Sequence, residues 1–310
     1  MRAYAMGKIG IGINAKLING SLVALKNVLD RVEQVDFDVV ELPLHGLDVI
    51  VGGRIRSKRL KEIKNILKDY PFTYSLHCPE SLNLMNLRKA EVEKSILKSS
   101  IDFAYEISAH ILVYHPGRYK SETEILLNKQ KRLKQKESEN LKKIEQDILK
   151  SLSSTLKDAN VILCMENARP FIGEEGYTYA EDIEELVKQV KEIDDENIRI
   201  ALDFGHAYLS TSLYNKDFLK TVSKVKPYLK HLHLHDNFGY PSYFQEKDQN
   251  LLIVNGRGDM HMPPGWGKIP FKKAIQVLNP ADCFFIIELR PRYFEYIKES
   301  KEALKTLIKS

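Results

Sequence analysis

The sequence predicts an α/β fold, a closed barrel of eight parallel strands that alternate with eight helices, the (β/α)8 or TIM barrel. Two observations lead to this prediction. Short apolar runs alternate with longer amphipathic segments along all 310 residues, as is typical of parallel α/β folds. Six of the apolar runs also end in an acidic residue or a histidine. In such barrels the chemistry lies where the strands end.

The eight predicted strands are short and rich in apolar and β-branched residues. In chain order they are KIGIGIN (8–14), FDVVELP (37–43) and the runs that end at or near His77, His115, Glu166, Asp203, His233 and Glu288. Most are followed by Pro, Gly or Asn, which favour turns. One polar strand end is ordinary, because strand ends meet solvent, but six in series indicate a shared site.

Helices are predicted between the strands, at residues 21–34, 57–69, 88–108, 136–157, 180–193, 215–226, 270–279 and 296–309. Two connections are longer than usual. Residues 118–140 are rich in Lys, Gln and Glu and are predicted to form a solvated helix extension. Residues 236–269 follow the seventh strand and are predicted to form a functional loop. No linker interrupts the pattern, so one domain is expected over residues 1–310.

Composition narrows the functional class. The chain is 43% hydrophobic and 29% charged, enough for a sizeable core, and its charge of +5 favours anionic substrates without marking a dedicated nucleic-acid binder. No apolar stretch reaches the 18 residues of a membrane span, and the N-terminal sequence lacks the features of a signal peptide. A cytoplasmic protein is therefore predicted. Cys78, Cys164 and Cys283 are expected to be core residues in a reducing compartment.

The residues at and near the strand ends include nine potential metal ligands, which are His77, His115, Glu166, Asp203, His206, His233, Asp259, His261 and Glu288. Imidazole and carboxylate groups suit Zn²⁺ and Mn²⁺. The members on four successive strands, Glu166, Asp203, His233 and Glu288, are expected to converge on one open metal site.

The other five potential ligands exceed what one ion needs. His206 follows Asp203 in a predicted turn, DFGH, and Asp259 and His261 alternate in GDMHM, so these three could hold a further ion. His77 and His115 on adjacent strands could hold another, with Glu166 as a bridge. The expected result is a cluster of two or three metal ions.

Seven segments, SLHCP, VYHPG, MENA, DFGHA, HLHD, GDMH and IIELR, occur in this order on these strands. In order and spacing the chain resembles the endonuclease IV and xylose isomerase-like TIM-barrel superfamily, which includes AP endonuclease family 2 and sugar phosphate isomerase/epimerase-like proteins. The resemblance implies three zinc ions. The first would bind His77, His115 and Glu166, the second Glu166, Asp203, His233 and Glu288, and the third His206, Asp259 and His261. In the isomerase branch, the four residues of the second set hold one ion and the two glutamates move the substrate proton.

The chain departs from the endonucleases of this superfamily just after His77. Those enzymes carry an aromatic and apolar wedge that opens the duplex, whereas this chain reads Cys78–Pro79–Glu80–Ser81–Leu82. A carboxylate here would repel a phosphate backbone. ELPLHG after the second strand, and the arginine that follows Glu288, resemble the sugar-isomerase branch instead.

Four further residues are predicted to contact substrate. Arg118 and Arg290 follow His115 and Glu288 and could bind a phosphate or a carboxylate. Trp266 could cap the substrate or anchor its loop, and Glu41 ends the second strand. Of the remaining histidines, His45 is a candidate pocket residue. His110 and His231 begin strands and are assigned to the opposite face of the barrel. His235 could face the same side as His233, but His233 is preferred as the metal ligand.

Two functions remain open at this point. The first is endonuclease IV-like phosphoester hydrolysis on a sugar-phosphate or abasic DNA, with up to three Zn²⁺ ions and with Glu166 and Asp203 as bridges. The alternative is a sugar or sugar-phosphate isomerase or epimerase with Mn²⁺, Mg²⁺ or Co²⁺, in which Glu166 and Glu288 transfer the proton. The predicted catalytic residues are therefore Glu166, Glu288 and Asp203.

Overall fold

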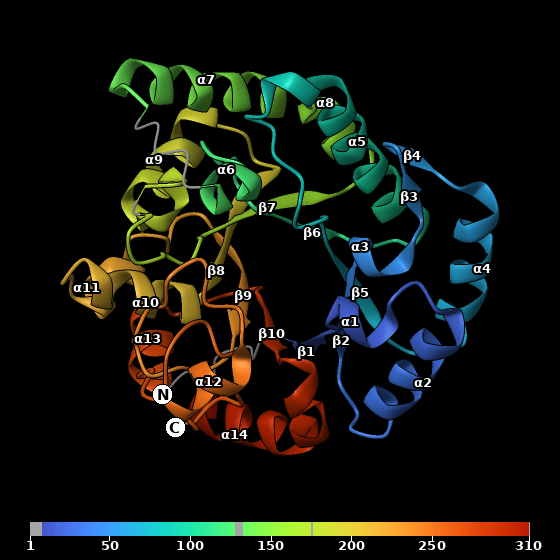
Figure 1. The fold of residues 1–310 in the computed structure, drawn as a ribbon. Coiled ribbons are helices and arrows are strands. Elements are labelled where there is room, and N and C mark those ends of the chain that lie inside the picture. The colour runs from blue at the N-terminus through green and yellow to red at the C-terminus, as the bar shows by residue number, and fades with distance from the viewer. Residues whose placement is uncertain (1–7, 128–132, 175, 310) are drawn as a thin grey trace.

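The computed structural model describes residues 8–127, 133–174 and 176–309, and it confirms the predicted barrel. Eight parallel strands close into a ring in the order β1-β10-β9-β8-β7-β6-β5-β2, with helices around the outside (Figure 1). The strands are β1 (Ile9–Gly12), β2 (Val39–Pro43), β5 (Thr73–His77), β6 (Ile111–Tyr114), β7 (Ile162–Glu166), β8 (Ile198–Asp203), β9 (Leu229–Leu234) and β10 (Phe284–Glu288). A small antiparallel pair, β3 (Ile50–Val51) and β4 (Arg54–Ile55), lies apart from the ring.

The helices mostly follow the predicted order. They are α1 (Ala15–Ile18), α2 (Leu22–Glu33), α3 (Leu44–Leu47), α4 (Ser57–Leu67), α5 (Ala90–Glu106), α6 (Glu122–Leu126), α7 (Gln135–Ser151), α8 (Ser153–Asp158), α9 (Ile183–Ile193), α10 (Phe204–Leu213), α11 (Phe218–Ser223), α12 (Gln249–Val254), α13 (Phe271–Leu278) and α14 (Ile297–Lys309). Short 3-10 turns cover Leu87–Lys89, Tyr179–Glu181 and Pro291–Tyr296.

Three predicted segments differ from the structure. The helix expected over 136–157 is divided near Leu152 into α7 and α8. In the lysine-rich stretch 118–140 the structure has the short α6 and the start of α7, while residues 128–132 lie outside the described residues, as do residues 1–7 of the N-terminus. The connection 236–269 is mostly irregular, as predicted, but contains α12.

Two cores hold the barrel together. The larger lies between the outer faces of the strands and the surrounding helices, and includes Leu42, Leu163 and Leu202. A smaller cluster inside the barrel contains Ile111, Val113, Cys164 and Ala201. Strands buried on both faces explain why the sequence shows apolar runs with little alternation.

Gly10 in β1 packs closely against both neighbouring strands, β2 and β10. A Cβ atom at this position would lie 2.6 Å from Ile286 Cδ1 and 2.7 Å from the backbone oxygen of Val39. The backbone cannot yield as a side chain can, so Gly10→Ala is expected to lower the free energy of unfolding by about 2 kcal/mol, within the range for overpacked cores. Urea denaturation measures the change. The control is Val23→Ala on the exposed face of α2, expected to change stability by less than about 0.5 kcal/mol. Equal stability of the two variants would contradict the packing argument.

In the described part of the chain, no helix is both long and apolar enough to cross a bilayer.

Candidate metal centre

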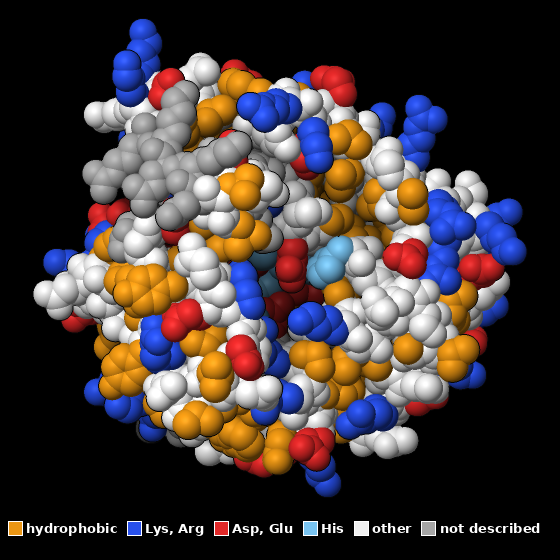
Figure 2. Space-filling model, viewed as in Figure 1, with side chains coloured by type: hydrophobic (Ala, Val, Ile, Leu, Met, Phe, Trp, Pro, Cys, Tyr) orange, Lys and Arg blue, Asp and Glu red, His pale blue; other side chains and the backbone are white. Residues whose placement is uncertain are grey.

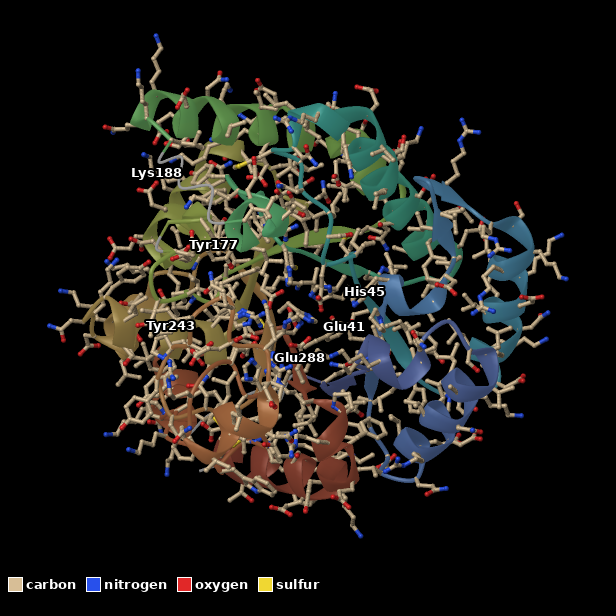
Figure 3. The ribbon with its side chains drawn as sticks, viewed as in Figure 1. Glu41, His45, Tyr177, Lys188, Tyr243 and Glu288 are labelled. Carbon is tan, nitrogen blue, oxygen red and sulfur yellow. The ribbon has the colours of Figure 1, made fainter. Side chains whose placement is uncertain are left out.

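A deep pocket opens at the ends of the barrel strands. Its volume is about 400 Å³, and Figure 2 shows the molecule hollowed at this point, with acidic side chains inside and lysine and arginine side chains around the opening. Glu41, His45 and Glu288 lie toward its centre in Figure 3. Of the nine potential ligands, those that line the pocket are His77, His115, Glu166, His206, His261 and Glu288.

The structure brings all nine potential ligands together. They form a first group (His77, His115, Glu166), a second group (Glu166, Asp203, His233, Glu288) and a third group (His206, Asp259, His261), which His235 joins. Within each group, one nitrogen or oxygen atom of every member lies within 4.8 Å of the others. Ligands of one Zn²⁺ ion, each about 2 Å from it, have separations of this order.

Glu166 is the residue that the first two groups share. Its Oε2 atom lies 2.8 Å from His115 Nε2 and 3.3 Å from His77 Nε2, whereas Oε1 lies 2.9 Å from His233 Nδ1. The side chain is almost fully buried. Its two oxygens therefore face two different groups, which is the arrangement that a carboxylate bridging two cations requires.

The hydrogen bonds of two histidines show that the residues fit bound cations. His77 Nδ1 lies 2.8 Å from the carbonyl oxygen of Cys78, and His206 Nδ1 lies 2.9 Å from that of Asn167. Each Nδ1 can only donate there, so in the neutral ring the lone pair is on Nε2. Those Nε2 atoms face carboxylates, and His206 Nε2 is buried without a hydrogen-bond partner. A bare lone pair opposite a carboxylate repels it unless a proton or a cation lies between them.

The electrostatics of the metal-free site lead to the same conclusion. Burial alone would lower the pKa of His77, but the hydrogen bond and charge of Glu166 raise it to about 9. Burial also opposes protonation of His206, yet Asp203 and Asp259 raise its pKa to about 10. Protons on these rings thus provide the positive charge that the buried carboxylates need. A divalent ion can replace them.

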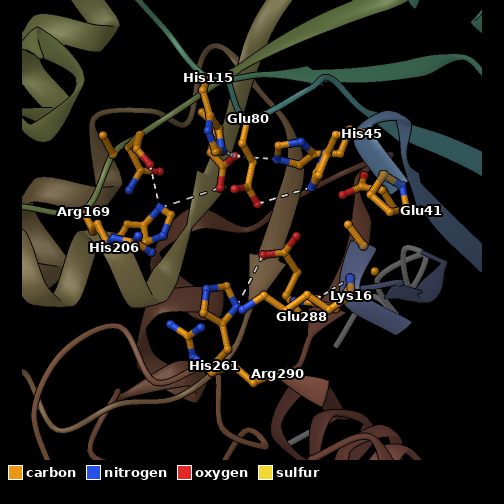
Figure 4. Close-up of a pocket in the computed structure, with 18 of the residues that line it drawn as sticks. Lys16, Glu41, His45, Glu80, His115, Arg169, His206, His261, Glu288 and Arg290 are labelled. Atoms are coloured by element: carbon orange, nitrogen blue, oxygen red, sulfur yellow. Dashed lines mark hydrogen bonds and ion pairs between the residues drawn. The ribbon is translucent and has the colours of Figure 1, made fainter. Parts of the chain in front are cut away.

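Glu288 differs from Glu166 in its environment. Burial raises the pKa of Glu288 to about 7, partly offset by the charge of His233. Burial likewise acts to raise the pKa of Glu166, but the charges of His233 and His115 hold it well below its usual value. Glu288 Oε1 lies 3.6 Å from His233 Nδ1, and its side chain is partly open to the pocket (Figure 4). Two carboxylates with pKa values pushed apart can act as acid and base.

Asp203 is fixed by the helix that follows it. Its Oδ1 atom accepts a 2.6 Å hydrogen bond from the backbone N–H of His206 and thereby caps α10. Asn167 holds its backbone on the other side through two hydrogen bonds. The prediction that DFGH is a turn is therefore wrong, because His206 stands in the first turn of a helix over Phe204–Leu213. The helix predicted at 215–226 corresponds to α11 (Phe218–Ser223), so α10 itself was not predicted.

Glu41 holds the far side of His233. It is almost fully buried, and its Oε1 accepts a 2.8 Å hydrogen bond from His233 Nε2, which leaves Nδ1 to face Glu166. Ser75 donates to its Oε2, and His231 Nε2 lies 2.9 Å from the same atom. The placement of His231 at the opposite face is wrong: it is fully buried inside the barrel, two residues below His233 on the same strand face.

Glu41→Gln is expected to weaken binding of one metal ion by about 10- to 100-fold, the effect typical of losing a carboxylate that orients a ligand histidine. An amide can present its NH₂ group to His233 and so disturb the tautomer that frees Nδ1. Competition with a calibrated chelator measures the change. Ser75→Ala is the matched control, since it removes one hydrogen bond to Glu41 and keeps its charge; equal affinity in both variants would show that the carboxylate does not position His233.

Of the residues predicted to contact substrate, Arg118 and Arg290 lie in the pocket, whereas Trp266 does not. Arg118 and Arg290 line the pocket, but Arg118 donates to the carbonyl oxygens of Glu80 and Ser81, and Arg290 to that of Asp259. Trp266 is not a pocket-lining residue: its indole N–H donates to Glu299 and its ring packs on Tyr296. Of the two roles considered for Trp266, the structure therefore favours loop anchoring.

Three further basic residues line the pocket and were missed, which are Lys16, Arg169 and Lys247. Arg169 pairs with Asp259 Oδ2, and Lys16 lies on α1 at the rim. Arg169 follows Glu166 by three residues, a spacing that distinguishes it little from any surface arginine. No sequence signal separates it from the other arginines of the chain.

The fold and these groups define a barrel that carries, at the ends of its strands, side-chain groups that could hold divalent metal ions. The chain belongs to the xylose isomerase-like TIM barrel family, whose model matches residues 29–309. An uncharacterized protein of Methanocaldococcus jannaschii is 24% identical over 91% of this chain and 84% of its own length. A probable endonuclease 4 of Mesomycoplasma hyopneumoniae (strain J) is 29% identical over 67% of this chain and 72% of its own length.

Solved structures with the same fold include sugar epimerases. A D-tagatose 3-epimerase-like protein superposes with a TM-score of 0.70 at 22% identity and covers 97% of both chains. An IOLI protein with a binding zinc atom superposes with a TM-score of 0.66 at 16% identity, over 97% of this chain and 98% of its own. At these identities the likeness establishes the fold.

Proposed function

We infer that this protein is a divalent-metal-dependent enzyme that isomerises or epimerises a small sugar or sugar-phosphate. The observation that carries this proposal is the convergence of Glu166 and Glu288 on the same nitrogen, His233 Nδ1, at the floor of a pocket of about 400 Å³. A pocket of this size suits a small molecule. The D-tagatose 3-epimerase-like protein and other sugar epimerases of the same fold support the proposal.

The two glutamates divide the work in this reaction. Glu166, Asp203, His233 and Glu288 would hold the divalent ion. When bound, it would polarise the substrate carbonyl and the neighbouring hydroxyl and so acidify the C–H bond of the carbon that carries the hydroxyl. One glutamate takes the proton from carbon and the other returns a proton to the neighbouring carbon or to the opposite face. Glu288 is the more open of the two and has the pKa nearer neutrality, so it suits the first step.

The rim of the pocket favours an anionic substrate. Five basic residues line it together with one carboxylate near the opening, Glu80; they are Lys16, Arg118, Arg169, Lys247 and Arg290. Glu80 lies 3.6 Å from His45 Nε2. A single phosphate or carboxylate can approach the basic side chains, since arginine recognises such groups in a bidentate manner. We therefore favour a phosphorylated sugar over a neutral one.

Phosphoester hydrolysis is a second candidate because the first and third groups provide more ligands than isomerisation needs. Several cations close together can stabilise both the attacking and the leaving oxygen of a phosphoryl displacement. The likeness to a probable endonuclease 4 supports this candidate. Against a DNA substrate, Glu80 lines the pocket where a phosphate backbone would have to pass.

Incubation of the metal-loaded protein in D₂O with a panel of aldoses, ketoses and their phosphates tests the proposal. NMR is expected to show deuterium entering the carbon next to the carbonyl of at least one substrate. The same preparation is incubated with an abasic-site duplex, and chelator-stripped protein is the control for both assays. Metal-dependent nicking without any deuterium incorporation would replace isomerisation by hydrolysis.

A further inference from the structure

We propose that the third group is a closed zinc site, in which His235 is the fourth protein ligand beside His206, Asp259 and His261, and that its ion pins the 236–269 connection to the barrel. This inference goes beyond the proposed function, which needs only the open second group. Zinc with four protein ligands has a structural role, whereas a catalytic zinc keeps a position open.

His235 has the placement of a ligand. Its side chain is fully buried, its Nδ1 has no hydrogen-bond partner, and its Nε2 lies 3.7 Å from Asp259 Oδ1 and 3.0 Å from Asp203 Oδ2. Its ring stacks on that of His261, with centroids 3.7 Å apart. The sequence preferred His233 over His235 as a member of the second group, and the structure places His233 there; His235 lies within the third group instead.

The chain makes room for this ring at Gly205. A Cβ atom there would lie 1.9 Å from His235 Cε1, so any residue other than glycine at position 205 would displace His235. The other members of the group also carry unused polar atoms. His206 Nε2 and Asp259 Oδ1 are both buried without a hydrogen-bond partner, which is costly unless an ion occupies the space between them.

Asp259 and His261 are held in place by their surroundings. Arg169 pairs with Asp259 Oδ2 and Arg290 donates to its backbone oxygen, so Oδ1 remains for a cation. His261 adopts a left-handed backbone conformation, with φ of 44°, which is strained for a residue other than glycine. Its Nε2 lies 2.9 Å from Asp259 Oδ2. Figure 4 shows His206 and His261 on the same side of the pocket.

The ligands come from segments that an ion would tie together. His206 belongs to α10 and His235 directly follows β9, whereas Asp259 and His261 lie far along the 236–269 connection. Within this connection, the strand-like pairings among the described residues are two isolated bridges, Asp236 with Met262 and Tyr240 with Arg257. Cross-linking a long connection limits its freedom more than cross-linking a short one. Loss of the ion should therefore loosen this segment first.

Counting zinc in variants of the zinc-loaded protein tests the assignment. His235→Asn and His206→Asn are each expected to retain one zinc ion fewer than the wild type. The double variant should lose no further ion, because both residues are proposed to bind the same one. Glu288→Gln affects the second group. The double variant Glu288→Gln with His235→Asn is therefore expected to bind one zinc ion fewer than Glu288→Gln alone. His235→Cys, which supplies another good zinc ligand, should restore the ion. His110→Asn, at an exposed histidine bonded to Asn160, is the control and should retain them all.

Limited proteolysis gives a second readout. Cleavage within 236–269 is expected in His235→Asn under conditions that leave the wild type and His110→Asn intact. If His235 only orients Asp203 from outside, Glu288→Gln with His235→Asn will retain as many ions as Glu288→Gln alone, and the proposal fails. None of these measurements depends on turnover, so they can fail or succeed independently of the proposed reaction.

Anomalous diffraction from the zinc-loaded wild type decides the question even if a variant does not fold. A zinc peak about 2.0–2.1 Å from a His235 nitrogen supports the closed site. A zinc ion bound by His206, Asp259 and His261 with water as its fourth ligand, or no zinc at this group, overturns it.

Discussion

Glu288→Gln is expected to lower kcat for proton exchange by about 10²- to 10⁴-fold, the usual contribution of a general acid or base. The substitution keeps the size of the side chain and removes its ability to accept a proton from carbon. KM should change much less, because the basic residues at the rim are untouched. The measurement is the rate of deuterium incorporation into the substrate, with zinc or manganese content determined on the same samples.

The matched control is Glu80→Gln, which changes a second pocket-lining carboxylate that belongs to none of the three groups. It should keep kcat within a few-fold of the wild type and raise the affinity for a phosphorylated substrate. Because Glu288 is also a candidate ligand, the decisive comparison is made at saturating metal. Should Glu288→Gln with full metal occupancy retain wild-type exchange, another group moves the proton.

The strand ends of the barrel were predictable because the fold repeats one rule. Each parallel strand is buried on both faces and ends where the chain turns out of the barrel, so an apolar run followed by a polar residue marks its end. His77, Glu166, Asp203 and Glu288 each stand at the last residue of a strand. Convergence on one pocket then follows from closure of the barrel, without knowledge of any side-chain conformation.

Depth within the barrel could not be predicted from the same pattern. His231, His233 and His235 alternate along one strand and so face the same side, but they occupy three levels: one beside Glu41 inside the barrel, one in the second group and one in the third. The strand period fixes the face and leaves the level open. Gly205, the glycine of DFGH, leaves room for the His235 ring. This contact cannot be inferred from the sequence, because it exists only once α10 packs beside β9.

Helix α10 was missed for a related reason. Its ten residues carry Gly205 and His206 in the first turn and are largely buried, so no polar face marks it as an amphipathic helix. The N-cap is Asp203, which is also the last residue of β8. Because the strand ends where the helix begins, no turn sequence separates the two elements and marks the start of the helix. Tertiary packing against β8 and β9 therefore determines this helix.

Removing the metal ions is expected to reverse the pH dependence of stability between pH 6.5 and 8.5. In the metal-free protein the pKa of His77 is raised to about 9 and that of His206 to about 10, whereas both are near 6.5 in the unfolded chain. The folded state then binds more protons than the unfolded state across this interval. Their stabilising effect is complete below pH 6.5 and is lost as the pH rises through 9 and 10. Each group contributes a slope of at most about 1.4 kcal/mol per pH unit.

The metal-loaded protein should behave in the opposite way, because an ion binds the neutral imidazoles and competes with protons for them. Its free energy of unfolding is expected to rise or hold across the same interval, so that the two curves separate with increasing pH. Urea denaturation at four pH values, with chelator or with saturating zinc, measures both curves. His77→Asn with His206→Asn should make the falling curve of the metal-free protein shallower, while His233 and His235, whose pKa values are also raised, keep part of the slope. A metal-free protein that gains stability from pH 6.5 to 8.5 would mean that these rings are already neutral in the folded state, and that the buried carboxylates are stabilised by something other than shared protons.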